Sequence, residues 1–460
     1  MDKYNANEQF RCTIIRGKSI SKMDDLLPVY AEILQEICPI SKKDFAEIFD
    51  ENLSKFILDD IKTIKNHRTE NAGKLLGMYF EKDGIIYISD RTKQYLKDND
   101  QPAFFKSVCY RFQQPNGSQK IQTIKEKIDY SIKSKPYHFI LKVLQIAEND
   151  NNIISKKEIA YYILNSLEVL QGKVKPETVY KQIINDRKKG LNYKVEYPDK
   201  AYSYSMQHIN EQFDYLELAN LIRKDKDNIW LNNAEKIAIN FFIEDLDNPL
   251  HFNIYNYDLS DKSSRKKLYL DWQEYFGEIS EEEIKAFVTS IQSLDKELEI
   301  HKEISTIEIG DEGELFVLNK EKEIIKSFNP RLVNKVNHHG KTKGLGYDIT
   351  SIEAKRNIKN PEFLRYIEVK STKRVHPPNL EQTYDTLHFT RNEWVAAQQH
   401  LEHYYIYRVY FTSQGVFMKI IKNPYDKNQK GELYATPLMY RIEFNEKAID
   451  ETYKYASNEK

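Results

Sequence analysis

A short motif occurs twice in this chain, and the repeat restricts the folds that are open to its first half. Residues 40–49 read I-S-K-K-D-F-A-E-I-F, and residues 154–163 read I-S-K-K-E-I-A-Y-Y-I. In both copies a serine can cap a helix that begins there, with an acidic residue three positions later in the first turn. The repeat therefore predicts two related units, each with a helix that begins at the motif.

Each copy of the motif is surrounded by the same kinds of predicted elements. An amphipathic helix precedes each copy and a second helix follows it, and the hairpin candidates are residues 74–89 and 221–231. The second hairpin comes after an inserted stretch at about 190–212. Three helices and a hairpin are the order of a winged-helix domain. We therefore expect tandem, helix-rich winged-helix units for DNA recognition at residues 1–115 and 116–245.

The second unit carries candidate DNA contacts. Its predicted helix at 176–189 has a basic end that could contact phosphates if this is the recognition helix. Amide and guanidinium groups can also bond base edges through two hydrogen bonds. Solvation of an outer helix face explains the same charges equally well. The candidate DNA-binding residues on this helix are Lys181, Gln182, Asn185, Arg187, Lys188 and Lys189.

A second pattern, in the last third of the chain, carries candidate chemistry. Residues 344–351 read G-L-G-Y-D-I-T-S, and residues 365–372 read R-Y-I-E-V-K-S-T. Glu368 and Lys370 flank one valine in an apolar run, so a strand would project both from one face. Asp348 opens a second predicted strand. If the two strands pair, one face carries two carboxylates and a lysine.

This set of side chains suits the hydrolysis of phosphodiesters. Two carboxylates and a main-chain carbonyl form an all-oxygen site for Mg²⁺, which takes few protein ligands and keeps several waters. A lysine beside the ion can position or deprotonate a water and stabilise charge at phosphorus. An E-x-K triplet that stands alone can also be explained without a metal site, as a solvated strand with an ordinary Glu/Lys pair. The predicted metal ligands are Asp348, Glu368 and the Val369 carbonyl, and Mn²⁺ can substitute for Mg²⁺.

The same region resembles a known family through four motifs in order. They are the two segments just quoted, G-D-E-G-E-L-F-V at 310–317 and F-T-R-N-E-W-V-A-A at 389–397. Together they are similar to the NO VEIN C-terminal-like domain, which appears in restriction and defence proteins, and they resemble the PD-(D/E)XK nuclease pattern. Tyr347 stands where the name of that pattern has proline. The resemblance covers about residues 300–425.

The resemblance implies a mixed-sheet PD-(D/E)XK nuclease domain, which we place at 305–460 after a helical linker at 246–304. In the last motif, Thr390 and Glu393 form a capping box at the start of a helix, which explains both without catalysis. The resemblance implies a catalytic set of Asp348, Glu368, Lys370 and Glu314. Further candidate DNA contacts beside this set are Lys341, Lys343, Ser371 and Lys373.

Charge, apolar content and cysteine number limit which classes of protein this chain can belong to. The chain has 69 Lys and Arg against 70 Asp and Glu, so its net charge of −1 requires any DNA-binding surface to be a local patch. No apolar run approaches the ~20 residues that span a bilayer, and the N-terminus lacks a signal core, so we expect a cytoplasmic protein without a membrane segment. Isolated Cys12, Cys38 and Cys109 fit reduced thiols.

These patterns predict a Mg²⁺-dependent, site-specific DNA endonuclease of the restriction type, with recognition and cleavage in separate domains of an α+β multidomain chain. Its expected partner is double-stranded DNA. One active site cuts one strand, so cleavage of both strands would need a homodimer or two sequential nicks, and a cognate methyltransferase is a further possible partner. Two alternatives stay open: a non-catalytic winged-helix DNA-binding regulator with a vestigial nuclease fold, and a nuclease specific for RNA or modified DNA.

Overall fold

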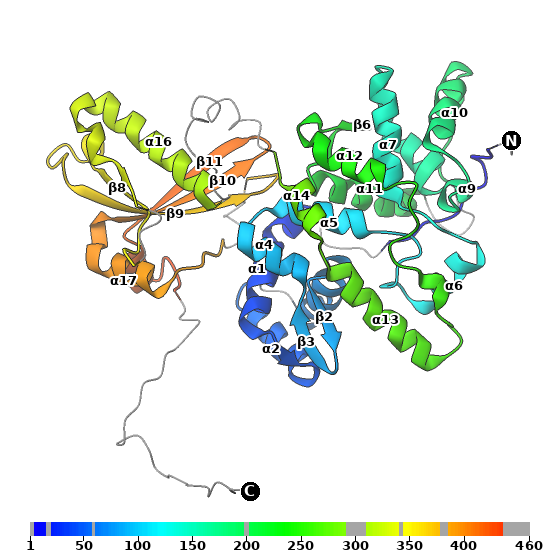
Figure 1. The fold of residues 1–460 in the computed structure, drawn as a ribbon, viewed down its shortest axis with the longest axis horizontal. Coiled ribbons are helices and arrows are strands. Elements are labelled where there is room, and N and C mark those ends of the chain that lie inside the picture. Colours follow the sequence, from blue (N-terminus) through cyan, green and yellow to red (C-terminus); the bar gives the residue numbers. More distant parts are fainter. Residues whose placement is uncertain are drawn as a thin grey trace, which may run out of the picture.

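The computed structural model divides the chain into a helix-rich N-terminal part and a C-terminal sheet that carries helices on its faces (Figure 1). The predicted division into a helix-rich part and a mixed C-terminal sheet is thus confirmed. The residues that the structure describes are 4–14, 20–57, 60–196, 202–290, 310–339, 344–377 and 385–435.

The first repeat lies in a unit of helices and a three-stranded sheet with the strand order β1-β3-β2. The Ser41 side chain accepts a hydrogen bond from the Asp44 backbone, as the cap predicted. The predicted hairpin is present, and the first two residues of the motif form a third strand beside it. The elements are α1 (Ile20–Ile37), β1 (Ile40–Ser41), α2 (Lys42–Ser54), α3 (Ile61–Asn66), η1 (His67–Leu75), β2 (Tyr79–Lys82) and β3 (Ile85–Ile88).

The second repeat lies in a matching unit with the strand order β4-β6-β5. Ser155 and Glu158 form a complete capping box at its motif. The elements are α7 (Pro136–Asn149), β4 (Ile154–Ser155), α8 (Lys156–Ile159), η2 (Ala160–Leu164), α9 (Leu167–Leu170), α10 (Pro176–Lys188), α11 (Tyr202–Leu218), β5 (Ile222–Asp225) and β6 (Asn228–Leu231).

One element of this second unit departs from the sequence prediction. The stretch that was predicted to be an insertion holds most of α11, and α11 directly precedes the hairpin. One more helix than expected therefore separates α10 from the hairpin. Ile209, Phe213 and Leu216 recur at helical spacing and are buried, which explains why the segment is helical despite the polar residues between them.

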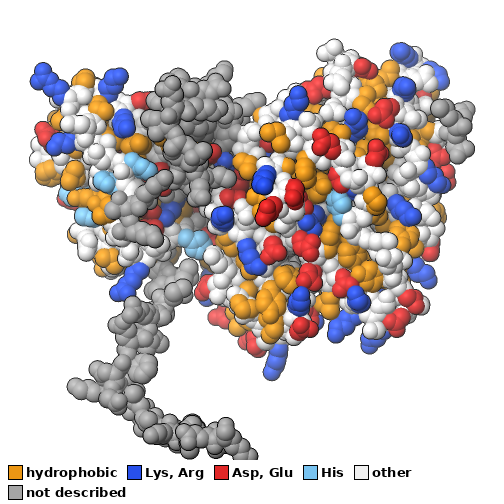
Figure 2. All heavy atoms as spheres, viewed as in Figure 1, with side chains coloured by type: hydrophobic (Ala, Val, Ile, Leu, Met, Phe, Trp, Pro, Cys, Tyr) orange, Lys and Arg blue, Asp and Glu red, His pale blue; other side chains and the backbone are white. Residues whose placement is uncertain are grey.

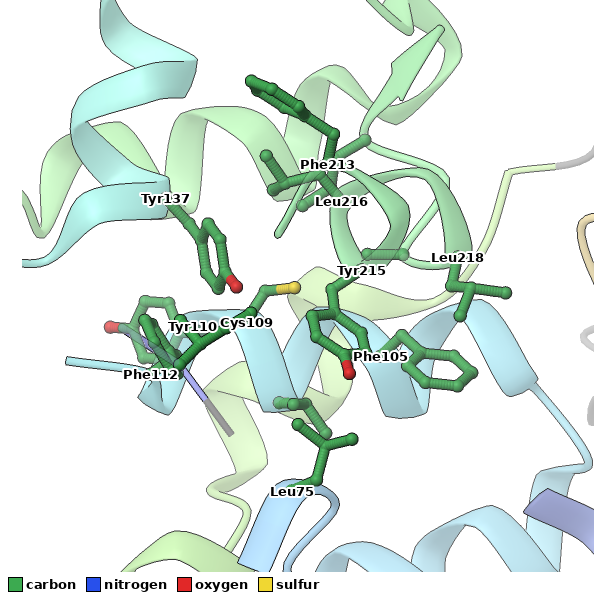
Figure 3. Close-up of a cluster of buried hydrophobic side chains, with 14 of the residues drawn as sticks. Leu75, Phe105, Cys109, Tyr110, Phe112, Tyr137, Phe213, Tyr215, Leu216 and Leu218 are labelled. Carbon is green, nitrogen blue, oxygen red and sulfur yellow. The ribbon is translucent and has the colours of Figure 1, made fainter. Parts of the chain in front are cut away.

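The two units share one hydrophobic core. Figure 3 shows Cys109 of α5 (Gln101–Arg111) close to Tyr137 of α7, and Phe105 of α5 close to Tyr215 and Leu218 of α11. All five are buried, and an aromatic side chain such as Phe105 contributes roughly 1.5–3 kcal/mol on full burial. The three cysteines are free thiols, as expected.

The segment predicted as a linker packs onto the same core where the structure describes it. Trp272 and Phe276 of α13 and Phe287 of α14 are buried there. The remaining elements of the N-terminal part are α4 (Asp90–Asp98), α6 (Ile121–Asp129), η3 (Asn233–Glu235), α12 (Lys236–Glu244), η4 (Ile254–Asn256), α13 (Lys262–Gly277) and α14 (Glu281–Phe287).

The C-terminal part is built on a five-stranded mixed sheet in the order β11-β10-β9-β8-β7. Strands β9 and β10 are parallel, and the other neighbours are antiparallel. Helices α16 and α17 flank the sheet (Figure 1). The elements are α16 (Gly310–Phe328), η6 (Pro330–Lys335), β7 (Asn337–His338), β8 (Ile349–Ile352), η7 (Ala354–Arg356), β9 (Leu364–Lys373), α17 (Arg391–His400), η8 (Leu401–His403), β10 (Tyr404–Thr412), β11 (Gly415–Lys422) and α18 (Pro424–Gln429).

The end of β9 joins the two parts of the chain. The Lys373 backbone donates a 3.0 Å hydrogen bond to the Asn99 carbonyl at the end of α4. The Arg374 guanidinium forms ion pairs with Asp24 (3.1 Å) and Asp25 (2.6 Å) of α1. The strand that carries the E-V-K motif is therefore fixed at one end to the N-terminal part. In the described ranges, no helix combines the length and the apolar character needed to cross a bilayer.

Candidate active site

Strand pairing brings the two predicted carboxylates together. Ile349, the first residue of β8, lies opposite Ile367 of β9. Asp348 directly precedes β8, and its charge acts on Glu368, the residue after Ile367. The Asp348 backbone donates to the Ile367 carbonyl at 2.9 Å, and its carboxylate accepts from the Val369 N–H at 2.8 Å. These bonds hold the Asp348 carboxylate against the backbone of the E-V-K strand.

A close approach between two backbones explains the glycine before Asp348. Gly346 has a φ of +75°, and a Cβ at this position would lie 2.4 Å from the Asn392 carbonyl oxygen in α17. Any side chain would collide with that backbone, so the loop can reach α17 only with glycine here.

Lys370 lies between two carboxylates. Its ammonium is 2.7 Å from Glu368 Oε1 and 3.0 Å from Glu393 Oε2. It also lies 5.3 Å from the centre of the Phe389 ring, within the range of a cation–π contact. Contacts from β9, from α17 and from the residue before the cap of α17 therefore restrict where the ammonium can be.

Burial and mutual repulsion shift the ionisation of this group of side chains. Burial, followed by the charge of Asp348, raises the pKa of Glu368, whose exposure is 3%. Burial, followed by the charge of Glu314, raises the pKa of Asp348. Burial alone would lower the pKa of Lys370, but the carboxylates of Glu368 and Glu393 outweigh it and raise that pKa. The site therefore favours a charged lysine and resists two ionised carboxylates unless a further cation is present.

Glu314 lies on the side of α16 that turns toward this site. Its carboxylate is 2.5 Å from His338 Nε2 of β7, and its charge raises the pKa of Asp348. The sequence left the rotation of this helix open, because the helical period alone does not say which face meets the sheet. The structure brings Glu314 to the Asp348 edge of the sheet.

Glu393 is the residue of this site that the sequence analysis assigned only to a helix cap. The capping box is present: Thr390 Oγ1 accepts from the Glu393 backbone, and Glu393 Oε2 accepts from the Thr390 N–H at 3.0 Å. The same Oε2 also accepts from Lys370. The position of Glu393 in a family motif was the sequence signal for a role in the site. Only the contact between α17 and β9 in the structure shows that Glu393 binds Lys370.

If this site hydrolyses phosphodiester bonds, as the sequence predicts, Glu393→Gln should lower DNA cleavage by roughly tenfold, at the low end of losses seen for residues that orient a functional side chain. Glutamine can still complete the capping box but offers Lys370 no charge. The matched variant is Thr390→Ala, which removes the cap side chain and should cost about 1 kcal/mol of stability with a smaller effect on cleavage. Equal losses of cleavage in both variants would mean that Glu393 acts only as a cap. Single-turnover rates and thermal melts make the comparison.

The predicted DNA contacts on α10 differ in their surroundings. Arg187 forms bonds of 2.5 and 2.7 Å with the carboxylate of Glu158, and Gln182 donates to Asp186. The Arg187 guanidinium is thus held by the capping box of α8. Arg187 is exposed despite this ion pair, and the other exposed candidates on this helix and directly after it are Lys181, Asn185, Lys188 and Lys189.

The other predicted contacts lie at or near the sheet. Lys373 is buried and forms a 3.0 Å ion pair with Glu312 of α16. Ser371 is partly buried on β9. Lys341 and Lys343 lie outside the described residues.

The donor set fits a hard divalent cation with few protein ligands. Over the described ranges, no group of three or more His, Cys, Asp or Glu side chains is arranged to hold a metal. Mg²⁺ needs fewer, because it keeps several waters. The Asp348 carboxylate is held against the Val369 backbone, and Glu368 is buried on the same strand beside Lys370. Burial and then a neighbouring carboxylate raise the pKa of each, and a cation at this place would offset both effects.

Comparison with known proteins gives matches to both parts of the chain. The family model described as restriction endonuclease BpuJI, N-terminal, matches residues 4–273. The model described as protein NO VEIN, C-terminal, matches residues 313–421 and confirms the resemblance stated above. No curated protein sequence matches the chain.

A solved structure extends the first match. It is described as the crystal structure of pyrene- and phenanthrene-modified DNA in complex with the BpuJ1 endonuclease binding domain. That chain is 48% identical to this one, with a TM-score of 0.58, and the alignment covers 60% of this chain and 100% of that chain.

Proposed function

This chain belongs to the family described as restriction endonuclease BpuJI, N-terminal, whose model matches more than half of it, and from that premise we propose that it is a Mg²⁺-dependent, site-specific DNA endonuclease. The N-terminal part would select double-stranded DNA, and the C-terminal sheet would hydrolyse a phosphodiester bond. The observation that carries the second half of the proposal is the constellation of Asp348, Glu368 and Lys370 on neighbouring strands.

The DNA-selecting role rests on the relative that was solved with modified DNA. Both units of this chain have helices around a three-stranded sheet that ends in a hairpin, which is the order of a winged helix. We propose that both units are winged helices. Winged-helix and helix-turn-helix domains read base edges from a helix in the major groove, so the exposed residues of α10 stay candidates for that contact.

In the proposed reaction each residue of the site has a separate task. Asp348 and Glu368 would hold the divalent cation, together with the Val369 carbonyl, and Glu314 would add negative charge beside Asp348. Lys370 would orient the attacking water and stabilise the charge that develops on the phosphate oxygens, because its two carboxylate partners favour its charged form. Glu393 would fix the position of the Lys370 ammonium. When bound, Mg²⁺ or Mn²⁺ would polarise the phosphate and lower the pKa of a bound water.

The arrangement favours an enzyme over a DNA-binding regulator with a vestigial nuclease fold. A regulator has no need for two carboxylates and a lysine in one group, and placing the two carboxylates close together in a largely buried site costs free energy. A nuclease specific for modified DNA is the second candidate, since the similar solved structure contains modified DNA. A nuclease specific for RNA is the other alternative from the sequence. A homodimer for double-strand cleavage and a cognate methyltransferase are further proposals.

The test is incubation of the protein with unmodified plasmid, methylated plasmid and RNA, each with Mg²⁺ or with EDTA. We expect discrete DNA fragments with Mg²⁺ and none with EDTA, because the carboxylates need the cation to bind a phosphate. Binding of DNA without cleavage of any substrate would contradict the proposal and favour the regulator. Cleavage of RNA, or of methylated DNA alone, would show that the substrate is RNA or modified DNA and not unmodified DNA.

A further inference from the structure

A basic pocket lies in the N-terminal part, away from α10 and from the nuclease sheet. It has a volume of about 480 Å³ and lies between the start of α6 and the first turns of α13. Figure 1 shows these two helices next to each other at the lower right of the molecule. Its cationic lining residues are Lys120, Lys262, Arg265 and Lys266, and no acidic residue lines it.

The cations of α13 occupy one face of the helix. Positions 262, 265, 266 and 269 follow the spacing i, i+3, i+4 and i+7, so Tyr269 lies on the same face as the three charges. Like charges at this spacing destabilise an isolated helix. None of the pocket's four cations forms an ion pair with any part of the chain that the structure describes, whereas Lys267, which does not line the pocket, is paired with Asp271. An unneutralised cluster of this kind is a place for an external anion.

The walls of the pocket are held by buried side chains. Ile124 of α6 and Leu268 of α13 pack together with Ile254 in a hydrophobic cluster beneath it. On the loop before α6, a Cβ on Gly117 would lie 2.5 Å from the Trp272 ring. The Trp272 indole also donates a 2.7 Å hydrogen bond to Ser118. The spacing between the two helices is thus fixed before any ligand binds.

Backbone groups add to the positive potential. Lys120 is the N-cap of α6 and offers no side-chain acceptor to the first-turn N–H groups of this helix. A helix N-terminus carries partial positive charge, and free N–H groups there bind phosphate oxygens. Asp261, which precedes the cations of α13, accepts from the Ser264 N–H as the N-cap of the helix and does not line the pocket.

We infer that this pocket binds phosphodiester groups of double-stranded DNA and forms a sequence-independent contact separate from the residues that read bases. The inference rests on the proposed function, because it takes DNA as the partner. Phosphate contacts of this kind fix the register of a protein on the duplex and carry no sequence information themselves. Tyr269 would pack against the sugar at the pocket edge, where its ring is partly exposed.

The test uses counterion release. Binding to fluorescent duplexes of unrelated sequence is measured in EDTA, so cleavage plays no part, over about 0.05 to 0.3 M salt. The slope of log K against log salt should fall in magnitude by ~0.9 for each phosphate contact removed. We expect a fall of roughly 2.7 for the triple variant Lys262→Gln, Arg265→Gln, Lys266→Gln, and roughly 0.9 for Lys120→Gln on the opposite wall.

Lys267→Gln is the matched control, since it removes one charge from the same helix outside the pocket. It should leave the slope unchanged. An unchanged slope in the triple variant, with the fold intact by circular dichroism, would overturn the inference while the unmutated protein still binds DNA. A change in sequence preference without a change in slope would also overturn it. If the unmutated protein binds no duplex at any salt concentration, the proposed function itself has failed.

Discussion

Replacing Asp348 with asparagine should lower DNA cleavage by about 10²–10³-fold while leaving DNA binding and folding intact. Asparagine keeps an oxygen that can accept the hydrogen bond from the Val369 N–H, so the loop should stay in place. It lacks the negative charge that would hold the cation, and loss of one group that stabilises transition-state charge costs on this order. Cleavage is measured in single turnover with saturating Mg²⁺, and binding is measured in EDTA.

Stability gives a second readout of the same variant. The pKa of Asp348 is raised by burial and by Glu314, and that of Glu368 by burial and by Asp348, so the two ionised carboxylates repel each other without a cation. We therefore expect the Asp348→Asn protein to be at least as stable as the unmutated protein in EDTA. Glu362→Gln, an exposed acid in the same part of the chain, is the control and should cleave normally. Normal cleavage by Asp348→Asn would remove Asp348 from the site.

The largest loss of stability is expected for Glu235→Ala, which breaks a fully buried ion pair. Lys106 of α5 and Glu235 of η3 are 2.8 Å apart, with side-chain exposures of 0% and 1%. Lys106 also donates to the Phe287 carbonyl and to Thr289, and Glu235 accepts from Asn220. Removal of Glu235 leaves a buried ammonium without its counter-charge, which costs about 3–5 kcal/mol. Urea denaturation of the N-terminal part measures the change.

Two further variants separate the effect of the buried charges on stability from the effect of side-chain packing. The double variant Lys106→Met, Glu235→Ala should recover part of the lost stability, because no buried charge is then left unpaired. Lys93→Ala breaks an exposed pair with Asp90 and should change stability by no more than about 1 kcal/mol. If Glu235→Ala costs no more than Lys93→Ala, the buried pair contributes nothing that a surface pair would not.

The local elements of this chain could be predicted where the signal is short in sequence. The Ser41 and Ser155 caps and the Thr390–Glu393 capping box each join residues three positions apart, and both hairpins join residues at most nine positions apart. The helix α11 was not predicted, although Ile209, Phe213 and Leu216 recur at helical spacing, because most of it lies in the stretch that was read as an insertion before the hairpin. Its helical state depends on burial against the core that both units share.

The sequence by itself determined that Glu368 and Lys370 project from one face of a strand, because side chains two residues apart on a strand lie on the same side. Only the tertiary structure decided their partners. Asp348 meets Glu368 across a strand pair, Glu393 reaches Lys370 from the following helix, and Arg374 joins the same strand to α1. The reason is distance along the chain: these contacts join residues that no local conformation brings together, so they exist only after the sheet and the core have formed.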